Sequence, residues 1–250
     1  MTAFVVPAAG LGLRFRDLFP GLAKPLIPIN GRPMLDLVVD NLEATAADIL
    51  IVVGRTQTGL SNWKPSRFPG EYIYHELESL TPGPASTVAA AVSQIPKDSD
   101  VIVLNSDQVV REGIGPFRDA LSRVGYGGLV MTMTATGDRW SFVETRAGVV
   151  KRLVEKEEIS SEATVGVYGW THRSILELSL SLGTSDDYAV KGELYVGPTF
   201  NPLIAAGIPV LTHYVGAMEQ AVAGLGTPSD LETSLGLGWF QDYLSSKDRR

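Results

Sequence analysis

The sequence predicts an α/β protein in which a mostly parallel sheet is sandwiched between helices. Short apolar runs such as 48–54 alternate with longer segments such as 33–44, whose apolar residues recur at helical spacing. The first apolar run, 3–8, leads directly into a glycine-rich turn at 10–12. A turn of this kind at the carboxyl end of a buried strand is typical of ligand-binding loops in open parallel sheets.

The alternation of strand and helix is regular over the first half of the chain. The predicted strands are 3–8, 48–54, 71–77, 100–107 and 127–136, and the predicted helices are 33–44, 83–95 and 113–124. Pro33 suits the first turn of its helix, where the missing N–H would have no intrahelical partner. Strands that are connected by helices in this way pair in parallel, with helices on both faces of the sheet.

The pattern changes after about residue 138. We expect hairpin strands at 141–145 and 148–156, a strand at 163–170, a helix at 173–183, the end of another helix at 201–207, a strand at 209–215 and a terminal helix at 229–244. Thr227 is predicted to cap the terminal helix, with Pro228 in its first turn. Because no linker or repeat divides the chain, we expect one domain over 1–250, in which 138–250 forms a smaller mixed-strand subregion beside 1–137.

The charge of the chain argues against nucleic acid as a partner. The net charge is -7 and the pI is about 5.0, whereas proteins that hold nucleic acid through its phosphates carry a basic face. A small phosphorylated substrate is compatible with this charge, since a few cations in a cleft are enough to bind it.

Residue types also restrict the chemistry. The chain has no cysteine and only three scattered histidines, which excludes thiolate catalysis and disfavours a zinc site. A bound metal would therefore be a hard cation on oxygen ligands, Mg²⁺ before any other. No signal-peptide pattern and no apolar run of membrane-spanning length is present, so we expect a soluble, cytoplasmic protein without membrane contact. The sequence carries no signal for the oligomeric state.

The glycine turn is followed by two cations. In PAAGLGLRF (7–15), Gly10 and Gly12 would let a phosphate chain approach the backbone, and Arg14 offers a planar set of donors that suits a phosphate. Lys24 adds a compact positive charge a short way downstream. The dinucleotide-binding fingerprint would need a third glycine where Phe15 stands, which disfavours a hydride-transferring enzyme. The alternative is a plain tight turn with solvated surface cations.

The stretches PAAGLGLRF (7–15) and KPLIPINGRPMLDLVVDNL (24–42) resemble the signature of sugar-phosphate nucleotidyltransferases, the pyrophosphorylases that make nucleotide sugars. The similarity is greatest to the subset found in capsule and surface-polysaccharide loci. It implies a Rossmann-like sheet of the GT-A-like type, with a nucleotide-binding half at 1–137 and an acceptor-binding half at 138–250. It also implies that the turn binds the nucleotide, through Ala8, Ala9, Gly10, Leu11 and Gly12. Leu13 stands where the family has Ser or Thr.

The loop LTPGPASTVAAA (80–91) is similar to the family's base-side loop. The resemblance implies that Gly83 lets the nucleobase pack against the backbone and that Thr81 or Ser86 supplies hydrogen bonds. Ser106, at the end of the fourth predicted strand, joins the nucleotide-binding set. The alternative for 80–91 is a helix N-terminus with Ser and Thr caps.

In the stretch VLNSDQVV (103–110), Asp107 stands just past a buried strand, at the carboxyl edge of the predicted sheet. A magnesium ion on the phosphates of a nucleotide needs a carboxylate at about this place, and the resemblance implies that Asp107 is that ligand. Asp230 is a second candidate ligand. It looks like a residue of the first helical turn, and Gly224 stands where many family members carry a second metal-binding aspartate.

The stretch RLVEKEE (152–158) resembles the family's strand-end Glu-Lys pair, in which the lysine contacts the acceptor phosphate and the glutamate contacts sugar hydroxyls. The resemblance assigns these roles to Lys156 and Glu155. Gly166 in VGVYGW (165–170) and Glu193 in KGELYVGPTFN (191–201) are implied to face the acceptor. The alternatives are a solvated charged strand end and ordinary packing.

These residues predict transfer of a nucleotidyl group from an NTP to a phosphorylated small molecule, most simply a sugar 1-phosphate, with release of pyrophosphate. Arg14, Lys24, Asp107 and Lys156 are the predicted catalytic residues. One alternative is a cytidylyltransferase whose acceptor is a phosphorylated amino alcohol or amide. Another is a catalytically weak nucleotide-binding regulatory module, which the changes at Leu13 and Gly224 motivate.

Overall fold

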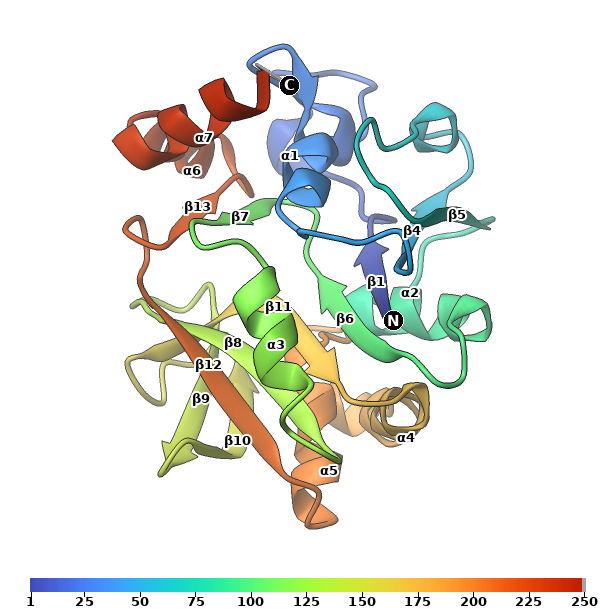
Figure 1. Ribbon diagram of the computed structural model, residues 1–250, viewed down its shortest axis with the longest axis vertical. Coiled ribbons are helices and arrows are strands. Elements are labelled where there is room, and N and C mark those ends of the chain that lie inside the picture. The colour runs from blue at the N-terminus through green and yellow to red at the C-terminus, as the bar shows by residue number, and fades with distance from the viewer. Residues whose placement is uncertain (249–250) are drawn as a thin grey trace.

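A computed structural model describes residues 1–248 of the chain, except for the side chains of 186, 247 and 248. A nine-stranded sheet runs through both halves in the order β5-β4-β1-β6-β11-β8-β12-β10-β9 (Figure 1). Its strands are β1 (Thr2–Pro7), β4 (Ile49–Arg55), β5 (Glu71–Leu77), β6 (Asp100–Leu104), β8 (Gly128–Thr134), β9 (Ser141–Arg146), β10 (Val149–Glu155), β11 (Glu162–Trp170) and β12 (Val210–Ala217). Two small pairs stand apart, formed by β2 (Pro28–Ile29) with β3 (Arg32–Pro33) and by β7 (Gln108–Val110) with β13 (Val222–Gly224).

The first half of the sheet is parallel, as predicted. β1 lies between β4 and β6, with Val5 opposite Ile51 on one side and Val103 on the other. β11 then pairs antiparallel with both β6 and β8, whereas β8 and β12 are parallel. The sheet as a whole is therefore mixed, and the strands of the second half extend it, with β10 and β9 as an antiparallel hairpin at its far edge.

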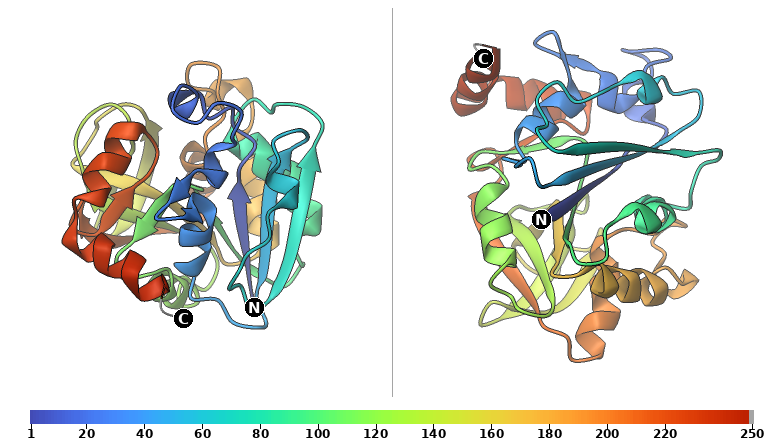
Figure 2. Two further views of the ribbon diagram at one scale, coloured as in Figure 1. Left: turned by 90° about the horizontal axis from the view of Figure 1, so that it is seen from above. Right: turned by 45° about the vertical axis from the view of Figure 1, so that its right-hand side comes forward.

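Helices cover both faces of the sheet, because its buried strands are apolar on both sides. They are α1 (Met34–Asp40), α2 (Pro84–Ala91), α3 (Gly115–Leu121), α4 (Arg173–Gly183), α5 (Phe200–Ala205), α6 (Pro228–Leu235) and α7 (Gly238–Asp248). Figure 2 shows helices on both sides of the sheet. In β1, Phe4 and Val6 belong to the apolar cluster that includes residues of α1 and α3, and Ala3 and Val5 to the cluster that includes residues of α2, α4 and α5. The predicted α/β sandwich is thus confirmed. Within residues 1–248, no helix combines the length and hydropathy needed to cross a bilayer.

The prediction of a single terminal helix over 229–244 is wrong. The segment forms two helices, α6 and α7, which are separated at Gly236 and Leu237. Glycine weakens a helix because it loses more backbone entropy than any other residue, and it commonly ends one. The predicted cap is confirmed, since the Thr227 hydroxyl accepts from the Asp230 N–H at 3.1 Å and Pro228 opens α6. α7 packs beside α1, where Tyr243 donates to the Leu37 carbonyl at 2.7 Å.

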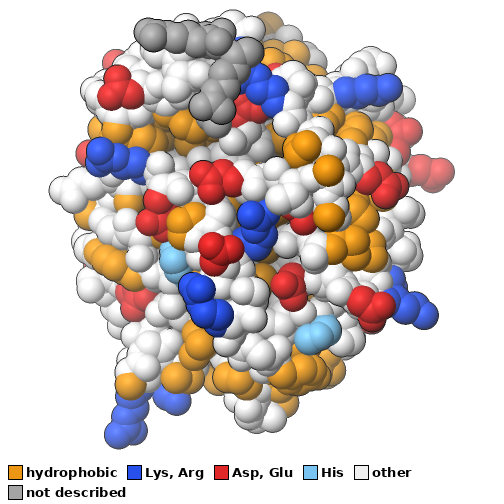
Figure 3. Space-filling model, in the orientation of Figure 1, with side chains coloured by type: hydrophobic (Ala, Val, Ile, Leu, Met, Phe, Trp, Pro, Cys, Tyr) orange, Lys and Arg blue, Asp and Glu red, His pale blue; other side chains and the backbone are white. Residues whose placement is uncertain are grey.

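Charged side chains are mixed over the face shown in Figure 3. Lys and Arg alternate with Asp and Glu there, and no broad basic area covers the described part of that face. This distribution accords with the net charge of -7.

A buried carboxylate, that of Asp48, fixes the start of the sheet. It accepts hydrogen bonds from the Thr2 N–H at 2.8 Å and the Thr45 N–H at 2.8 Å, and Arg118 lies 3.3 Å away. Burial alone would raise the pKa of Asp48, but these hydrogen bonds and the Arg118 charge outweigh burial and lower it. The ionised carboxylate is therefore the form that stabilises the fold.

We expect Asp48→Asn to lower the free energy of unfolding by about 2 kcal/mol at pH 7, because the amide removes the charge that faces Arg118 and replaces one of the two acceptor oxygens with a donor. A lowered folded pKa gives stability that is present above the ordinary aspartate value and is lost as the pH falls through the folded pKa. The difference between wild type and variant should thus shrink in acid. Urea denaturation at several pH values tests this, with the exposed Asp119→Asn as the control.

Candidate functional site

Two cavities meet at the carboxyl end of β1 and β6. One has a volume of about 580 Å³ and the other of about 540 Å³. Arg14, Pro84, Glu193 and Gly226 line both, so the cavities form one continuous cleft. Every residue predicted for the site lines at least one of them, except Ser86, which had been offered as an alternative to Thr81. The smaller cavity contains the residues predicted to bind nucleotide, Ala8, Ala9, Gly10, Leu11, Gly12, Thr81, Gly83 and Ser106, and the larger contains those predicted to bind the acceptor, Glu155, Gly166 and Glu193.

The glycine turn is open to the smaller cavity. Gly12 has a φ of +61°, in the left-handed region that favours glycine, and a Cβ there would approach the Lys24 Cβ to 3.1 Å. A Cβ on Gly10 would meet no atom within 4 Å. The turn therefore places bare backbone beside Lys24 and leaves space in front of it, as an approaching phosphate chain requires.

Lys24 and Asp107 form an ion pair at the centre of the cleft. The Lys24 ammonium donates to Asp107 Oδ2, and the two side chains are 18% and 19% exposed. Lys24 lines the smaller cavity and Asp107 the larger, so the pair marks the place where the two cavities join. The sequence predicted both residues for the site but not their contact with each other.

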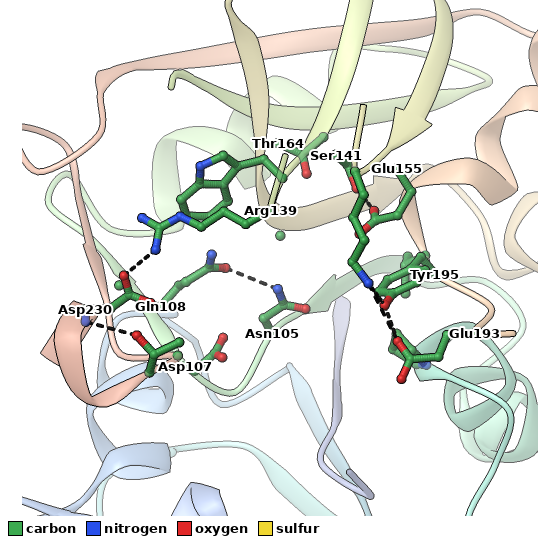
Figure 4. A pocket seen from close by; sticks show the side chains of 18 of the residues that line it. Asn105, Asp107, Gln108, Arg139, Ser141, Glu155, Thr164, Glu193, Tyr195 and Asp230 are labelled. Carbon is green, nitrogen blue, oxygen red and sulfur yellow. Dashed lines mark hydrogen bonds and ion pairs between the residues drawn. The ribbon is translucent and has the colours of Figure 1, made fainter. Parts of the chain in front are cut away.

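Asp230 lies on the same side of the cleft as Asp107. A Cβ on Gly226 would approach Asp107 Oδ2 to 3.1 Å and Asp230 Oδ2 to 3.7 Å, so the two carboxylates flank this glycine. Asp230 is in the first turn of α6, where its carboxylate also faces the positive end of the helix dipole. Arg139 Nη1 lies 2.5 Å from Asp230 Oδ1 (Figure 4).

This pair of carboxylates fits a magnesium site that is completed by a substrate. In the part of the chain that the structure describes, no three His, Cys, Asp or Glu side chains gather into a metal-binding group. Mg²⁺ commonly takes one or two carboxylates and completes its shell with water and substrate phosphates. Asp107 and Asp230 would supply those carboxylate oxygens, beside the cavity that would hold the triphosphate.

The loop at 80–91 is held together by its threonines. Thr81 Oγ1 and Thr87 Oγ1 are 2.6 Å apart, and both hydroxyls donate to the Gly83 carbonyl. Thr87 lines the cavity, and Ser86 is not among its lining residues. Gly83 is required for packing, since a Cβ there would lie 2.4 Å from the Leu194 carbonyl oxygen.

Lys156 lines the larger cavity beside Tyr195 and Glu193, which lie across the cavity from Asp230 (Figure 4). It has a φ of +59°, which is uncommon for a residue other than glycine and costs on the order of 1 kcal/mol. Its ammonium donates to the Tyr195 hydroxyl, lies 4.3 Å from the centre of that ring and 3.9 Å from Glu193 Oε2. Burial, with Glu193 beside it, raises the pKa of Tyr195, which therefore stays a neutral hydrogen-bonding group.

Glu155 is buried at the end of β10, where the Ser141 hydroxyl donates to its carboxylate. Burial raises the pKa of Glu155 above its usual range, although Ser141 and Lys156 oppose the shift. On the neighbouring wall, Asn105 Nδ2 donates to Gln108 Oε1 at 3.3 Å, next to Gly166. The walls of the cavity thus present amide and carboxylate groups of the kind that bind hydroxyls.

Several lining residues had not been predicted. Among them are Asn105, Gln108, Arg139, Trp140, Ser141, Thr164, Tyr168 and Thr227. Arg139 and Trp140 lie in the connection from β8 to the hairpin, the point at which the sequence pattern changes. That change was the one local signal that could have directed attention to them.

Solved structures share this fold. A nucleoside-diphosphate-sugar pyrophosphorylase from Vibrio cholerae RC9 aligns with a TM-score of 0.79 and 21% identity, over 93% of this chain and 99% of that one. The inositol-1-phosphate CTP transferase from T. maritima aligns with a TM-score of 0.75 and 14% identity, over 97% of this chain and 96% of that one. At these identities the likeness establishes the fold, and it confirms the predicted GT-A-like nucleotidyltransferase architecture.

The sequence also matches curated proteins and one family. The bifunctional protein GlmU of Burkholderia thailandensis is 26% identical over 217 residues, which are 83% of this chain and 46% of that protein. The chain thus spans about half the length of the curated relatives it matches. The MobA-like NTP transferase domain matches residues 4–162, a range that contains the glycine turn, Lys24, Asp107 and Lys156. The predicted resemblance is confirmed at this level: the chain belongs to the family of MobA-like NTP transferase domains and is a nucleotidyltransferase.

Proposed function

We propose that the chain transfers an NMP group from an NTP to a phosphorylated small molecule, most simply a sugar 1-phosphate, in a magnesium-dependent reaction that releases pyrophosphate. The single observation that carries the proposal is the Lys24–Asp107 pair at the junction of two cavities. One cavity is bordered by bare glycine backbone and suits a triphosphate. The other is lined by hydroxyl-binding groups and suits an acceptor.

The reaction needs anions to be brought together and needs no covalent intermediate on the protein. An oxygen of the acceptor phosphate attacks the α phosphorus of the NTP, the bond from that phosphorus to the bridging oxygen breaks, and pyrophosphate leaves with the electron pair. No general base is required, because the attacking oxygen is already anionic. The chain's task is to position the two substrates and to neutralise their repulsion.

Each cation has a place in this scheme. Arg14 lines both cavities and binds the leaving pyrophosphate, while Lys24 neutralises the α phosphate and Lys156 the acceptor phosphate. Mg²⁺, when bound on Asp107 and Asp230, supplies a Lewis acid for the phosphate oxygens. Glu155 and Glu193 accept hydrogen bonds from the acceptor's hydroxyl groups.

A second acceptor class has an observation in its favour. Two carboxylates, Glu155 and Glu193, line the larger cavity, and they would suit the cationic head group of a phosphorylated amino alcohol. One structural neighbour is a CTP transferase for an inositol phosphate, so the fold accepts non-sugar acceptors in that protein. The catalytically weak binding module stays a third candidate. Use of the product in capsule or surface polysaccharide, and a cytoplasmic location, remain predictions.

Pyrophosphate release tests the proposal. The protein would be mixed with Mg²⁺, one of CTP, UTP, dTTP, GTP or ATP, and a pool of sugar phosphates or of phosphorylated amino alcohols. Release with one NTP and one pool supports the reaction and identifies the base and the acceptor class. Silence with every pair, combined with a nucleotide-dependent rise in melting temperature, would favour the binding module.

The raised pKa of Glu155 predicts a pH dependence of acceptor binding. The ionised carboxylate accepts hydrogen bonds, so KM for the acceptor should rise as the pH falls through a value above the usual glutamate range. Glu155→Gln should raise KM at pH 7 on the order of tenfold and should lose the part of the acid response that comes from this group. KM for the acceptor would be measured from pH 5 to 8 with both proteins. The ionisation of the acceptor phosphate affects both proteins equally, so the difference between their curves reports the ionisation of Glu155. If KM changed with pH in the same way for both proteins, Glu155 would have no role in acceptor binding.

A further inference from the structure

Arg139 occupies an unusual position in the cleft. It lies between β8 and β9, lines the larger cavity, and contacts Asp230 Oδ1 at 2.5 Å (Figure 4). Its side chain is 53% exposed, whereas that of Asp230 is 16% exposed, and its guanidinium lies 4.6 Å from the centre of the Trp140 ring. Because Arg139 is half in water, its ion pair with Asp230 is screened and can break at little cost.

Each of the two carboxylates beside Gly226 forms an ion pair with a cation of the chain. Lys24 pairs with Asp107, and Arg139 pairs with Asp230. Arg139 contacts Asp230 Oδ1, and the other oxygen, Oδ2, faces Gly226 beside Asp107. A divalent cation that binds these carboxylates weakens both ion pairs, because it neutralises the negative charge that holds each side chain. The Arg139 pair is the weaker of the two ion pairs, because Arg139 is far more exposed than Lys24.

A guanidinium that leaves Asp230 stays next to the reacting groups. The acceptor phosphate has to reach the α phosphate near Asp107, which flanks Gly226 together with Asp230. Lys24 on this side is assigned to the α phosphate, and Lys156 donates to Tyr195, which lies with Glu193 across the cavity from Asp230 (Figure 4). A guanidinium released from Asp230 therefore adds a positive charge for the acceptor phosphate on the side of Asp107. Arginine binds phosphate through two parallel hydrogen bonds, which suits this role.

We propose that Arg139 is an acceptor-phosphate-binding residue which is held on Asp230 in the free protein and released when a metal–triphosphate complex takes that carboxylate. This inference rests on the proposed function. It makes acceptor binding depend on prior binding of the metal and the triphosphate, and by thermodynamic linkage the acceptor phosphate strengthens the binding of that complex by the same factor.

Calorimetric binding of Mn²⁺-tripolyphosphate tests the release, since this probe carries the phosphates of an NTP without any base. Arg139→Gln should bind the complex roughly two- to fivefold more tightly than wild type, the gain expected from removing one exposed ion pair. Inorganic phosphate added afterwards should bind on the order of tenfold more weakly to Arg139→Gln, because it loses a charged two-point contact. Arg139→Lys should restore part of the phosphate affinity.

Arg146→Gln is the matched control, since Arg146 is exposed, lines neither cavity and carries the same charge. It should match wild type in both titrations. If Arg139→Gln bound Mn²⁺-tripolyphosphate equally or more weakly, or bound inorganic phosphate as wild type does, the inference would be overturned while the proposed function stood. If wild type did not bind Mn²⁺-tripolyphosphate at all, the proposed function would fail, and this inference with it.

Discussion

Asp107→Asn should reduce the rate of pyrophosphate release on the order of 1,000-fold or more. The substitution keeps the shape of the side chain and removes its charge. Two consequences follow in the cleft. The proposed magnesium site loses one of its two carboxylates and keeps only that of Asp230. Lys24 also loses its ion-pair partner at the junction of the two cavities. Both changes act on the α phosphate, where charge is redistributed during the reaction.

Fold stability has to be separated from chemistry in this experiment. Asp107 is partly exposed and the amide still fits, so the melting temperature of the free protein should change little. The exposed Asp17→Asn, which makes the same change of charge near the glycine turn, is the control and should retain wild-type activity. An Asp107→Asn protein that released pyrophosphate at the wild-type rate would remove Asp107 from the reaction.

The first half of the fold could be predicted because each of its elements has a local signature. Strands β1, β4 and β6 are buried on both faces and therefore read as unbroken apolar runs that end at polar or glycine residues. The position of β11 could not be predicted in the same way. It inserts antiparallel between β6 and β8, and no property of residues 162–170 alone specifies its neighbours.

In the site, too, single residues could be predicted from local sequence, whereas contacts between distant residues could not. Asp107 and Lys24 could be predicted from the strand end and the turn that carry them, but their ion pair joins residues 83 positions apart. Arg139 and Asp230 are 91 positions apart, and neither had a local reason to be matched with the other. The sequence predicts Asp230 as a first-turn helix residue, and α6 confirms this. Its place beside Asp107 comes from the tertiary contact at Gly226.

Gly166→Ala should raise KM for the acceptor on the order of 100-fold, since displacing groups that position a substrate by about 1 Å can cost that much. Gly166 has a φ of +86°, and an alanine Cβ would lie 2.3 Å from Asn105 Nδ2 and 2.5 Å from Gln108 Oε1. These two amides are hydrogen-bonded to each other on the wall of the larger cavity. At least one of them must move, so the polar surface that we propose for the acceptor's hydroxyls is rebuilt.

The strain of an alanine at positive φ must be distinguished from this collision. Gly148, in the turn between β9 and β10, offers the comparison, because its φ is +74° and a Cβ there meets no atom within 4 Å. Gly148→Ala and Gly166→Ala should each lower the free energy of unfolding by about 1 kcal/mol through backbone strain. Only Gly166→Ala should change the acceptor KM, and it should do so with little effect on the binding of Mn²⁺-tripolyphosphate. Equal acceptor KM values in the two variants would place the acceptor away from the Asn105–Gln108 wall and would favour the side of the cavity formed by Glu193 and Tyr195.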